Sequence, residues 1–427
     1  GDVYKRQIMK NLKIIIAIVC VCLICVSAAY EIFGPKNGTQ KNSPKQTEVT
    51  FWSLQMGTFN SYMEPLIAEF EKENPEIKIK WIDVPYSEGE KRTLASILSN
   101  TPPDLVNLTP DFSSVLAQKQ ALEFIDCKKL SNYNKQIIET LKYDGKCYAV
   151  PFYATSSLTF YNKEILKQAG IKNLPKTFDE MNAMAVQIKD KTGKFVTMPT
   201  LTENDTLLKI LNKYDINSSE KITSDKSVKI FDEYKYLYAK DLIPKESITQ
   251  NHQEALEKYM SGQLAFIQSG ANFLNIVKEN APQVFKHTDV SNQLTGSNGK
   301  YDVSIMNLII PARAKNKEAA LKFALFLTNK QNQVELAKLT TILPANNESL
   351  KDSYFTVYDD TDVISKARYI SAEQLNNLQK QIKFKNNHKE IITLLNTTVQ
   401  KIILSEKNST KQELESTAKN WKRLENN

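Results

Sequence analysis

Few residues of this 427-residue sequence stand at spacings that support chemistry. Its three histidines, His252, His287 and His388, have no cysteine, aspartate or second histidine at the spacing of a metal site. The sequence also lacks a G-x-S-x-G nucleophile turn, a phosphate-binding P-loop and a G-x-G-x-x-G stretch after a strand. We therefore predict no catalytic residue, no metal ligand and no cofactor, and we do not expect an enzyme.

Acidic residues leave one enzymatic alternative open. Two carboxylates that are distant in sequence can cleave a glycosidic bond from the two sides of a cleft. Asp104, Asp111, Asp144 and Asp205 are candidates of this kind. Each is also an ordinary capping or surface carboxylate, which is the favoured interpretation, so an exported glycoside hydrolase is the less favoured alternative.

The distribution of charge gives no indication of nucleic-acid binding. The chain has a formal net charge of +8, from 56 Lys and Arg against 48 Asp and Glu. Lysines alternate with acidic residues, without a long basic run or a basic–aromatic motif. An apolar fraction of 41% and a charged fraction of 24% are typical of a globular protein, and the length suits two or three domains.

The N-terminal residues predict export. Lys10 and Lys13 precede an apolar run, residues 14–29, which ends in small residues at the spacing of a cleavage site. This run is also nearly long enough for an uncleaved membrane anchor, so both alternatives stay open. We expect residues 1–29 to be an N-terminal extension with a signal or anchor segment. Residues 30–47 are polar and aperiodic, and we expect a flexible tether.

The cysteines fall into two groups. Cys25 lies in the apolar run and is a candidate for lipidation, although Ile24 stands where a lipobox has a small residue. Cys127 and Cys147 are the two cysteines in the body of the chain. In an oxidising compartment they can form a disulfide, and the alternative is two separately buried thiols.

Hydrophobic periodicity after the tether predicts strands and helices in alternation. A buried strand at 49–52 is followed by a helix that Ser61 and Glu64 would begin with a capping box. Strict alternation at 76–81 predicts the next strand. A helix at 92–98 and a strand at 105–108 continue the series, which is typical of a parallel α/β sheet. The same analysis predicts two long amphipathic helices in the C-terminal tail.

Several of these segments together resemble a known family. Phe51-Trp52-Ser53 and the stretches 66–71 and 74–79 resemble the opening of family 1 extracellular solute-binding proteins, the carbohydrate- and maltodextrin-binding-protein-like receptors of ABC importers. The resemblance continues, in order and at similar spacing, to about residue 350. It includes the segments 103–106, 143–151, 158–163, 175–181, 266–270 and 316–323.

The resemblance implies an α/β fold of the two-lobed, periplasmic-binding-protein-like type II, with a hinge that the chain crosses more than once. The N-terminal lobe would hold residues 48–153 and about 303–350. The C-terminal lobe would hold residues 154–302 and about 351–427. The implied function is that of an extracytoplasmic substrate-binding subunit, which captures a sugar, an oligosaccharide or glycoside, by hinge closure.

The resemblance also places ligand contacts in the cleft. They are Gln55, Met56, Thr58, Thr109, Asp111, Tyr153, Thr155, Asn272 and Phe273. Relatives often have a stacking tryptophan where Asn272 stands, and Phe273 is the candidate replacement. Asp111 has a second interpretation as a helix cap, and Tyr153 as hinge packing. Trp52 and Trp81 lie on strands and are expected in the core rather than on a ligand.

The resemblance implies partners and a location as well. We expect a monomer outside the cytoplasm, periplasmic or tethered to the outer face of the membrane by its N-terminus. Its partners would be a small ligand and the transmembrane subunits of an ABC permease, with no nucleic acid. One alternative keeps the fold and changes the ligand to a polyol phosphate, an acidic sugar or a peptide. Another is a surface adhesin or sensor that uses the same closure.

Overall fold

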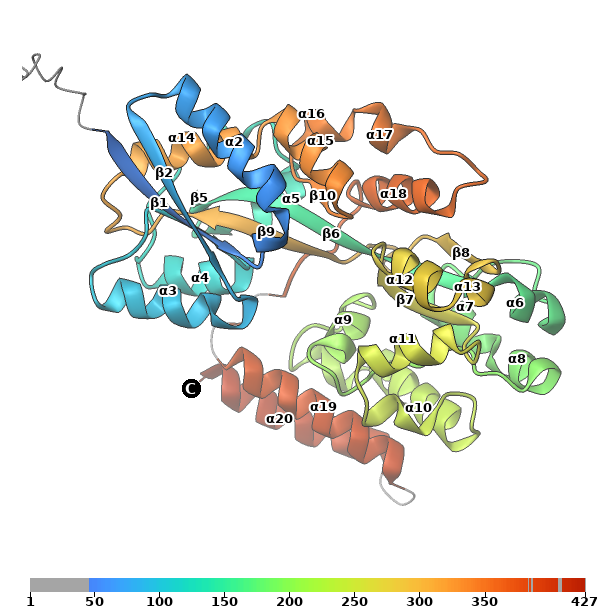
Figure 1. Ribbon diagram of the computed structural model, residues 1–427. Helices are drawn as coiled ribbons and strands as arrows, with labels where there is room; N and C mark the ends of the chain where they lie inside the picture. Colours follow the sequence, from blue (N-terminus) through green and yellow to red (C-terminus); the bar gives the residue numbers. More distant parts are fainter. Residues whose placement is uncertain (1–45, 383, 385–386, 406–408, 427) are drawn as a thin grey trace, which may run out of the picture. The chain divides into compact units, whose positions relative to one another are not determined.

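The computed structural model describes residues 46–382, 384, 387–405 and 409–426. The chain divides into residues 1–47 and 48–427, and the fold below is that of the second unit (Figure 1). The predicted signal or anchor segment, the tether up to residue 45 and Cys25 lie outside the described residues. Within the described part, no helix is both long and apolar enough to cross a bilayer.

Strands are concentrated in the first third of this unit and return near residues 266–309. They are β1 (Thr47–Leu54), β2 (Ile77–Val84), β3 (Leu105–Leu108), β4 (Lys142–Tyr143), β5 (Lys146–Cys147), β6 (Ala149–Asn162), β7 (Phe266–Gly270), β8 (Thr288–Ser291), β9 (Val303–Ile309) and β10 (Leu343–Pro344).

Helices connect the strands and form the C-terminal end. The first are α2 (Asn60–Glu73), α3 (Gly89–Leu98), α4 (Pro110–Gln118), α5 (Lys135–Thr140), α6 (Lys163–Ala169), α7 (Phe178–Ala183), α8 (Ala185–Thr192), α9 (Thr206–Asn212), α10 (Asp225–Ala239) and α11 (His252–Met260). The others are α12 (Phe273–Asn280), α13 (Pro282–Phe285), α14 (Lys317–Leu327), α15 (Lys330–Leu339), α16 (Asn347–Leu350), α17 (Ser353–Thr356), α18 (Val363–Gln374), α19 (His388–Leu404) and α20 (Thr410–Asn426).

The main sheet is mixed, which differs from the parallel sheet that the sequence predicts. Its order is β10-β6-β9-β3-β1-β2. β1 and β3 are parallel, as expected for strands joined by helical crossovers, but β9 lies antiparallel between β3 and β6. The alternation of apolar and polar residues identifies each strand by itself. The direction of β9 in the sheet depends on how the chain re-enters the sheet at residue 303, which is far from β3 in sequence. The predicted α/β class itself is confirmed.

β6 takes part in two sets of strand pairs. Its residues 149–156 pair with β9, and its residues 157–162 pair with β7 and β8. One continuous strand therefore joins the sheet of the first half to the strands of the second half (Figure 1). Along its second part, successive side chains enter different cores, because Phe160 packs with Leu158 while Tyr161 packs in another cluster.

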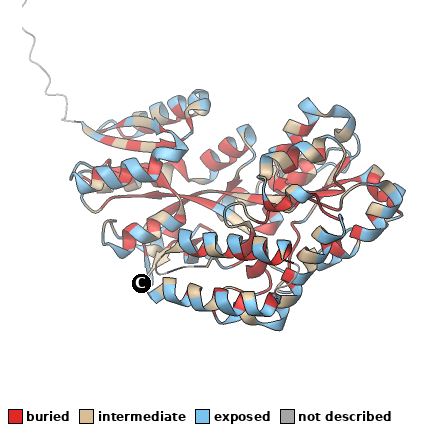
Figure 2. Cartoon of the chain, turned by 90° about the horizontal axis from the view of Figure 1, so that it is seen from below, coloured by how far each residue is buried: buried red, intermediate tan, exposed pale blue. Residues whose placement is uncertain are grey.

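Buried apolar side chains form three clusters. The first contains residues of β1–β6, β9, β10, α14, α15 and α17, and it reaches Leu378. The second lies among α6–α10 and the tail helices, and the third among β6, β7, α11 and α12. Figure 2 shows the result on the helices, which carry one buried side and one exposed side. Phe355, after the predicted boundary near residue 350, belongs to the first cluster.

The predicted N-terminus of the first helix is wrong in detail. α2 begins at Asn60, so Ser61 lies inside the helix, and the N-cap Phe59 makes no side-chain capping bond. A helix that already contains Ser61 cannot use the Ser61–Glu64 box, because that box needs Ser61 to precede the first helical turn. Helix α7, in contrast, has a side-chain cap, since the Thr177 side chain accepts the backbone N–H of Glu180.

Cys127 and Cys147 form a disulfide, with their Cα atoms 5.5 Å apart and a sequence separation of 20. Closing a loop of this length stabilises a fold by about 3 kcal/mol, mainly by restricting the unfolded chain. We expect the double variant C127S/C147S to lose about that much free energy of unfolding in urea denaturation. Reduction of the wild type should produce the same loss, and equal stability of the oxidised and reduced chains would contradict the prediction.

Candidate ligand-binding site

A cavity of about 770 Å³ lies beside the middle of β6. Its floor is formed by Thr155, Ser156 and Ser157 of that strand and by residues 302–304 at the start of β9. We call it the large cavity. The other walls come from the segment 197–206, from α9, α10 and α11, from residues 267–270 and from Asn272. Loops and helix starts therefore meet next to the strand that joins the two halves, a common place for a small-molecule site.

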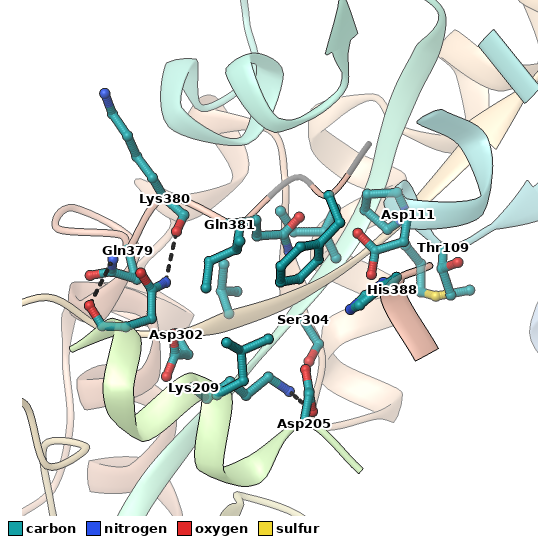
Figure 3. A pocket seen from close by; sticks show the side chains of 18 of the residues that line it. Thr109, Asp111, Asp205, Lys209, Asp302, Ser304, Gln379, Lys380, Gln381 and His388 are labelled. Carbon is teal, nitrogen blue, oxygen red and sulfur yellow. Dashed lines mark hydrogen bonds and ion pairs between the residues drawn. The ribbon is translucent and has the colours of Figure 1, made fainter. Parts of the chain in front are cut away.

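A second, smaller cavity of about 200 Å³ shares residues with the large one. Asp205, Lys209 and residues 302–304 line both, so the two cavities are neighbours. The small cavity adds Thr109 and Asp111 from the start of α4, together with Tyr86, residues 379–382, Phe384 and His388. Figure 3 shows Asp111 and Thr109 on one side and Asp205 with Lys209 on another.

Each lysine that lines the cavities near α9 is held by a carboxylate. Lys209 lies 3.0 Å from Asp205, and Lys213 lies 2.9 Å from Asp302. The first pair is largely exposed, whereas the Lys213 side chain is only 3% exposed. Burial lowers the pKa of Lys213, and the Asp302 carboxylate opposes this shift. Because both cations already have anionic partners, this wall offers no unpaired cation to an anionic ligand.

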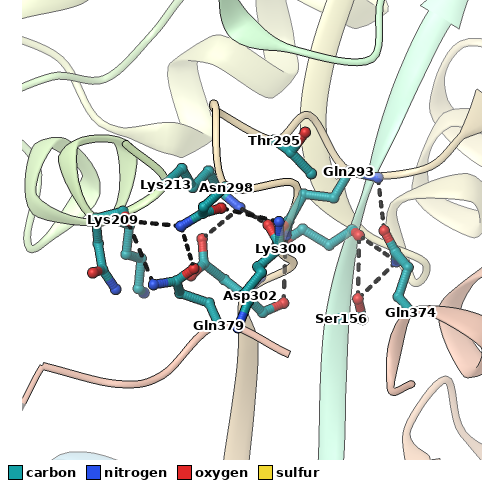
Figure 4. A network of polar contacts seen from close by, with 12 residues as sticks. Ser156, Lys209, Lys213, Gln293, Thr295, Asn298, Lys300, Asp302, Gln374 and Gln379 are labelled. Carbon is teal, nitrogen blue, oxygen red and sulfur yellow. Dashed lines mark hydrogen bonds and ion pairs between the residues drawn. The ribbon is translucent and has the colours of Figure 1, made fainter. Parts of the chain in front are cut away.

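Lys213 is the centre of a buried polar network (Figure 4). Its ammonium group donates to Gln293 at 2.7 Å and to the carbonyl of Lys300 at 3.3 Å. The backbone N–H of Gln293 donates to Gln374, whose amide donates to Ser156 on β6. The network therefore connects the end of α9, the connection between β8 and β9, helix α18 and strand β6.

The far wall of the large cavity contains Glu203, His252 and Ser269, which we call the His252 wall. His252 Nε2 lies 3.2 Å from Ser269 Oγ. Glu203 accepts the backbone N–H of His252 at 2.7 Å. A capping box between Asn251 and Glu254 begins α11 and fixes His252 as its first residue. The local fold therefore determines where the imidazole lies before any ligand binds.

Burial lowers the pKa of His252, and the nearby Glu203 carboxylate opposes this effect. Below about pH 6.5 the unfolded chain therefore takes up a proton at this residue more readily than the folded chain, and stability falls with falling pH. We expect the free energy of unfolding to drop less between about pH 7.5 and about pH 5.5 in H252Q than in the wild type. The exposed His287 provides the control, and an H252Q profile that matches H287Q would contradict the prediction.

Four of the nine predicted contact residues line a cavity. Thr109 and Asp111 line the small one, and Thr155 and Asn272 line the large one. Thr109 is also the N-cap of α4, which places Asp111 in the first turn of that helix. Tyr153 is half-buried on β6, with burial and Tyr86 raising its pKa to about 12. Contact of these residues with a ligand stays a prediction.

Met56 and Phe273 are corrected to core residues. Met56 is 4% exposed and Phe273 is 1% exposed. The ring of Phe273 packs edge-on against Phe160 and Tyr259, with centroids 5.3 and 5.8 Å away. The apolar interior accounts for both positions, and Phe273 is not available to stack on a ligand in place of the missing tryptophan.

Gln55 and Thr58 are exposed, and neither lines the two cavities. Their loop is held by Asp83, whose carboxylate accepts the backbone N–H groups of Met56 and Gly57, each at 2.8 Å. Gln55 itself has a positive φ of 53°. This loop is therefore fixed by β2, a contact that a local reading of the sequence does not reveal.

The residues that sequence reasoning missed come from distant segments. They include Glu203, Lys209, Lys213, His252, Ser269, Gln293, Asp302 and residues 379–382. No short motif contains them, and the sequence alone treated Asp205 and His252 only as isolated candidates for catalysis or metal binding. One local signal was present, because the box from Asn251 to Glu254 marks His252 as the first residue of a helix.

The large cavity combines polar and apolar side chains. Its polar ones are hydroxyls, amides, the His252 imidazole, the Glu203 carboxylate and two lysine–aspartate pairs, and its apolar ones include Met181, Met198, Leu256 and Ile267. Among residues 46–426 that the structure describes, no group of three or more His, Cys, Asp or Glu side chains is arranged to hold a metal ion.

Comparisons with known proteins agree with this arrangement. A chain from Bacillus subtilis (strain 168), the galactooligosaccharide-binding protein, is 24% identical over 342 residues, which are 76% of this chain and 80% of the relative. A crystal structure from Synechococcus sp. MITs9220, described as a proposed oligosaccharide periplasmic-binding protein, has a TM-score of 0.78 and 29% identity. It covers 88% of this chain and 99% of that one.

The fold is also that of the sugar-binding protein MalE from Xanthomonas citri, with a TM-score of 0.76 at 22% identity over 89% of this chain and 98% of that one. The predicted type II periplasmic-binding-protein-like fold is thereby confirmed. A sequence profile of one family, described as bacterial extracellular solute-binding protein, matches residues 55–334, more than half of the chain. This chain therefore belongs to the bacterial extracellular solute-binding proteins.

Proposed function

We propose that this chain is the extracytoplasmic substrate-binding subunit of an ABC importer and that it captures an uncharged oligosaccharide or glycoside. The large cavity carries this proposal. Its volume of about 770 Å³ lies in the range of sites that enclose a sizeable small molecule. Its walls combine hydroxyl and amide groups, which bond sugar hydroxyls, with apolar side chains, which pack on the faces of sugar rings.

The names of two similar proteins support a sugar as the ligand. One is the galactooligosaccharide-binding protein of Bacillus subtilis, and the other is the Synechococcus protein described as oligosaccharide-binding. The pairing of Lys209 with Asp205 and of Lys213 with Asp302 favours an uncharged sugar over a polyol phosphate or an acidic sugar. Asp111 and Asp205, two of the carboxylates considered for a glycoside hydrolase, both line the small cavity, and Asp205 is paired with Lys209. The proposal includes no chemistry on the ligand.

The proposed mechanism is closure of two lobes about the strand β6 and the segments 302–304 and 375–382. We assign residues 48–153 and about 303–350 to the N-terminal lobe and 154–302 and about 351–427 to the C-terminal lobe. Because Phe355 is buried in the first cluster, the boundary between the N-terminal and C-terminal lobes near residue 350 is better placed after α17. A ligand that contacts both lobes favours the closed form, since it binds that form more tightly.

The proposed cellular setting follows from the family. A monomer held at the outer face of the membrane by its N-terminus, or free in the periplasm, would deliver the liganded form to the permease. Lipidation at Cys25 is part of this proposal in the tethered case.

A thermal-shift screen tests the function. The purified chain is heated with galactotriose, maltotriose, cellotriose, glycerol phosphate, trigalacturonate, amino acids or short peptides. We expect a saturable rise in Tm with a neutral trisaccharide, which corresponds to about 2.7 kcal/mol when its concentration is 100 times Kd. The sugar should be recovered unchanged by mass spectrometry. A response confined to phosphates or peptides would overturn the ligand class, and cleaved sugar would support the hydrolase.

A further inference from the structure

The lining of the large cavity includes the His252 wall at the N-terminus of α11. Thr200 and Asn204 line the cavity together with Glu203, and His252 contacts both Glu203 and Ser269 of β7. A ligand that fills the cavity therefore contacts this wall.

The wall is built before a ligand arrives. Leu201 donates its N–H to the carbonyl of Ser247 at 3.0 Å, and the Thr202 hydroxyl donates to the carbonyl of Ile248 at 3.0 Å. These bonds tie the segment that carries Glu203 to the residues before α11. The 2.7 Å bond from the His252 N–H to Glu203 completes the connection. Groups that are already ordered lose little entropy when a ligand hydroxyl binds them.

The charge at this end of the cavity differs from that near α9. Asp205 and Asp302 each have a lysine partner, whereas no Lys, Arg or His side chain of the described residues forms an ion pair with Glu203. The Glu203 carboxylate therefore leaves an acceptor-only, negatively charged surface beside the half-buried imidazole. An anionic group placed there would face repulsion without a cation to offset it, while a hydroxyl could donate to the carboxylate.

We propose that Glu203, His252 and Ser269 form the specificity-determining end of the ligand site, which binds the hydroxyl groups of an uncharged terminal sugar and rejects a carboxylated or phosphorylated one. This inference rests on the proposed function. Glu203 accepts from one sugar hydroxyl, and the imidazole and the Ser269 hydroxyl exchange part of their mutual bond for bonds to the next hydroxyl.

The test uses the purified chain and isothermal titration with galactotriose, maltotriose, cellotriose and trigalacturonate. We expect H252A to weaken the binding of the responding neutral trisaccharide about tenfold or more, because a half-buried hydrogen-bonding partner is lost. H287A makes the same substitution at an exposed residue outside both cavities and should bind like the wild type. The Tm values without sugar, compared among the variants, show whether each one is folded.

A second variant tests the charge. E203Q keeps an oxygen that can accept the His252 N–H but removes the negative charge. We expect it to bring the affinity for trigalacturonate at least about tenfold closer to that for the neutral trisaccharide. E279Q removes the same charge from an exposed position on α12 and should leave this ratio unchanged.

Each outcome separates the inference from the function on which it rests. Neutral binding that is equal in the wild type and folded H252A and E203Q would overturn the inference and leave the function standing. Trigalacturonate binding as tight as neutral binding in the wild type would overturn the rejection of anions. Absence of binding by every neutral trisaccharide would overturn both.

Discussion

Replacement of Lys213 by methionine is expected to lower the free energy of unfolding by about 3 kcal/mol, because removal of the ammonium group leaves the partly buried Asp302 carboxylate without its cation. The Lys213 side chain is 3% exposed and its ammonium group contacts Asp302, Gln293 and the carbonyl of Lys300. Methionine matches the length of the chain but donates no hydrogen bond. Urea denaturation followed by far-UV circular dichroism measures the loss.

The control is K209M, which removes the lysine of α9 that lies closest in sequence to Lys213, the C-cap of the same helix. Lys209 is 49% exposed and pairs with Asp205, so its removal should cost no more than about 1 kcal/mol. In the K213M background, Asp302→Asn should recover part of the lost stability, since it removes the charge that remains. If K213M is as stable as K209M, the network of Figure 4 does not hold this region together.

Replacement of Trp421 by alanine is expected to cost about 3–5 kcal/mol, the usual range for the loss of a large buried aromatic side chain. Trp421 is fully buried in the second cluster although it lies six residues before residue 427. Its indole N–H donates to Glu425 at 2.9 Å, and α20 packs along α19 and α10. The cavity left by the substitution would lie between the tail helices and the second half of the fold.

The exposed Tyr236 on α10 provides the comparison. Its side chain is 50% exposed, so Y236A should change the free energy of unfolding by no more than about 0.5 kcal/mol. Both variants are measured by urea denaturation. A cost of W421A as small as that of Y236A would show that the tail helices pack only loosely on the cluster.

These two predictions separate two ways in which the second half of the fold is held. The tail helices contribute apolar area, as their one-sided burial shows in Figure 2. The Lys213 network contributes few but buried polar bonds next to the ligand cavity. Loss of the packing of the tail helices is expected to lower stability alone. Loss of the Lys213 network should also weaken ligand binding, because Lys213, Gln293 and Asp302 line the large cavity.

Contacts distant in sequence explain why some local interpretations were incomplete. Asp104, which the sequence offers as an ordinary capping or surface carboxylate, is buried and accepts the N–H of Thr50 at 2.9 Å and that of Asn316 at 2.8 Å. The two prolines before it restrict the chain locally. The partner at Asn316 is 212 residues away, and no local pattern could name it.

The sequence by itself determined the export signal prediction, the α/β class, most helices and strands, and the membership of a binding-protein family. Apolar residues that recur with a period of two or of 3.6 residues indicate a strand or a helix with one buried face, and this period can be read from the sequence itself. Even so, the start of α2 was misplaced, because a 3-10 turn (Gly57–Phe59) leads directly into the helix and its N-cap, Phe59, makes no side-chain capping bond.

Only the tertiary structure decided which residues face the ligand cavity. Met56 and Phe273 follow strands, as contact residues should, but their apolar side chains turn into the core. Glu203, His252 and Ser269 come together because β7, the start of α11 and the segment before α9 meet at one place. Which segments meet depends on the packing of the whole chain, and a sequence period carries no information about it.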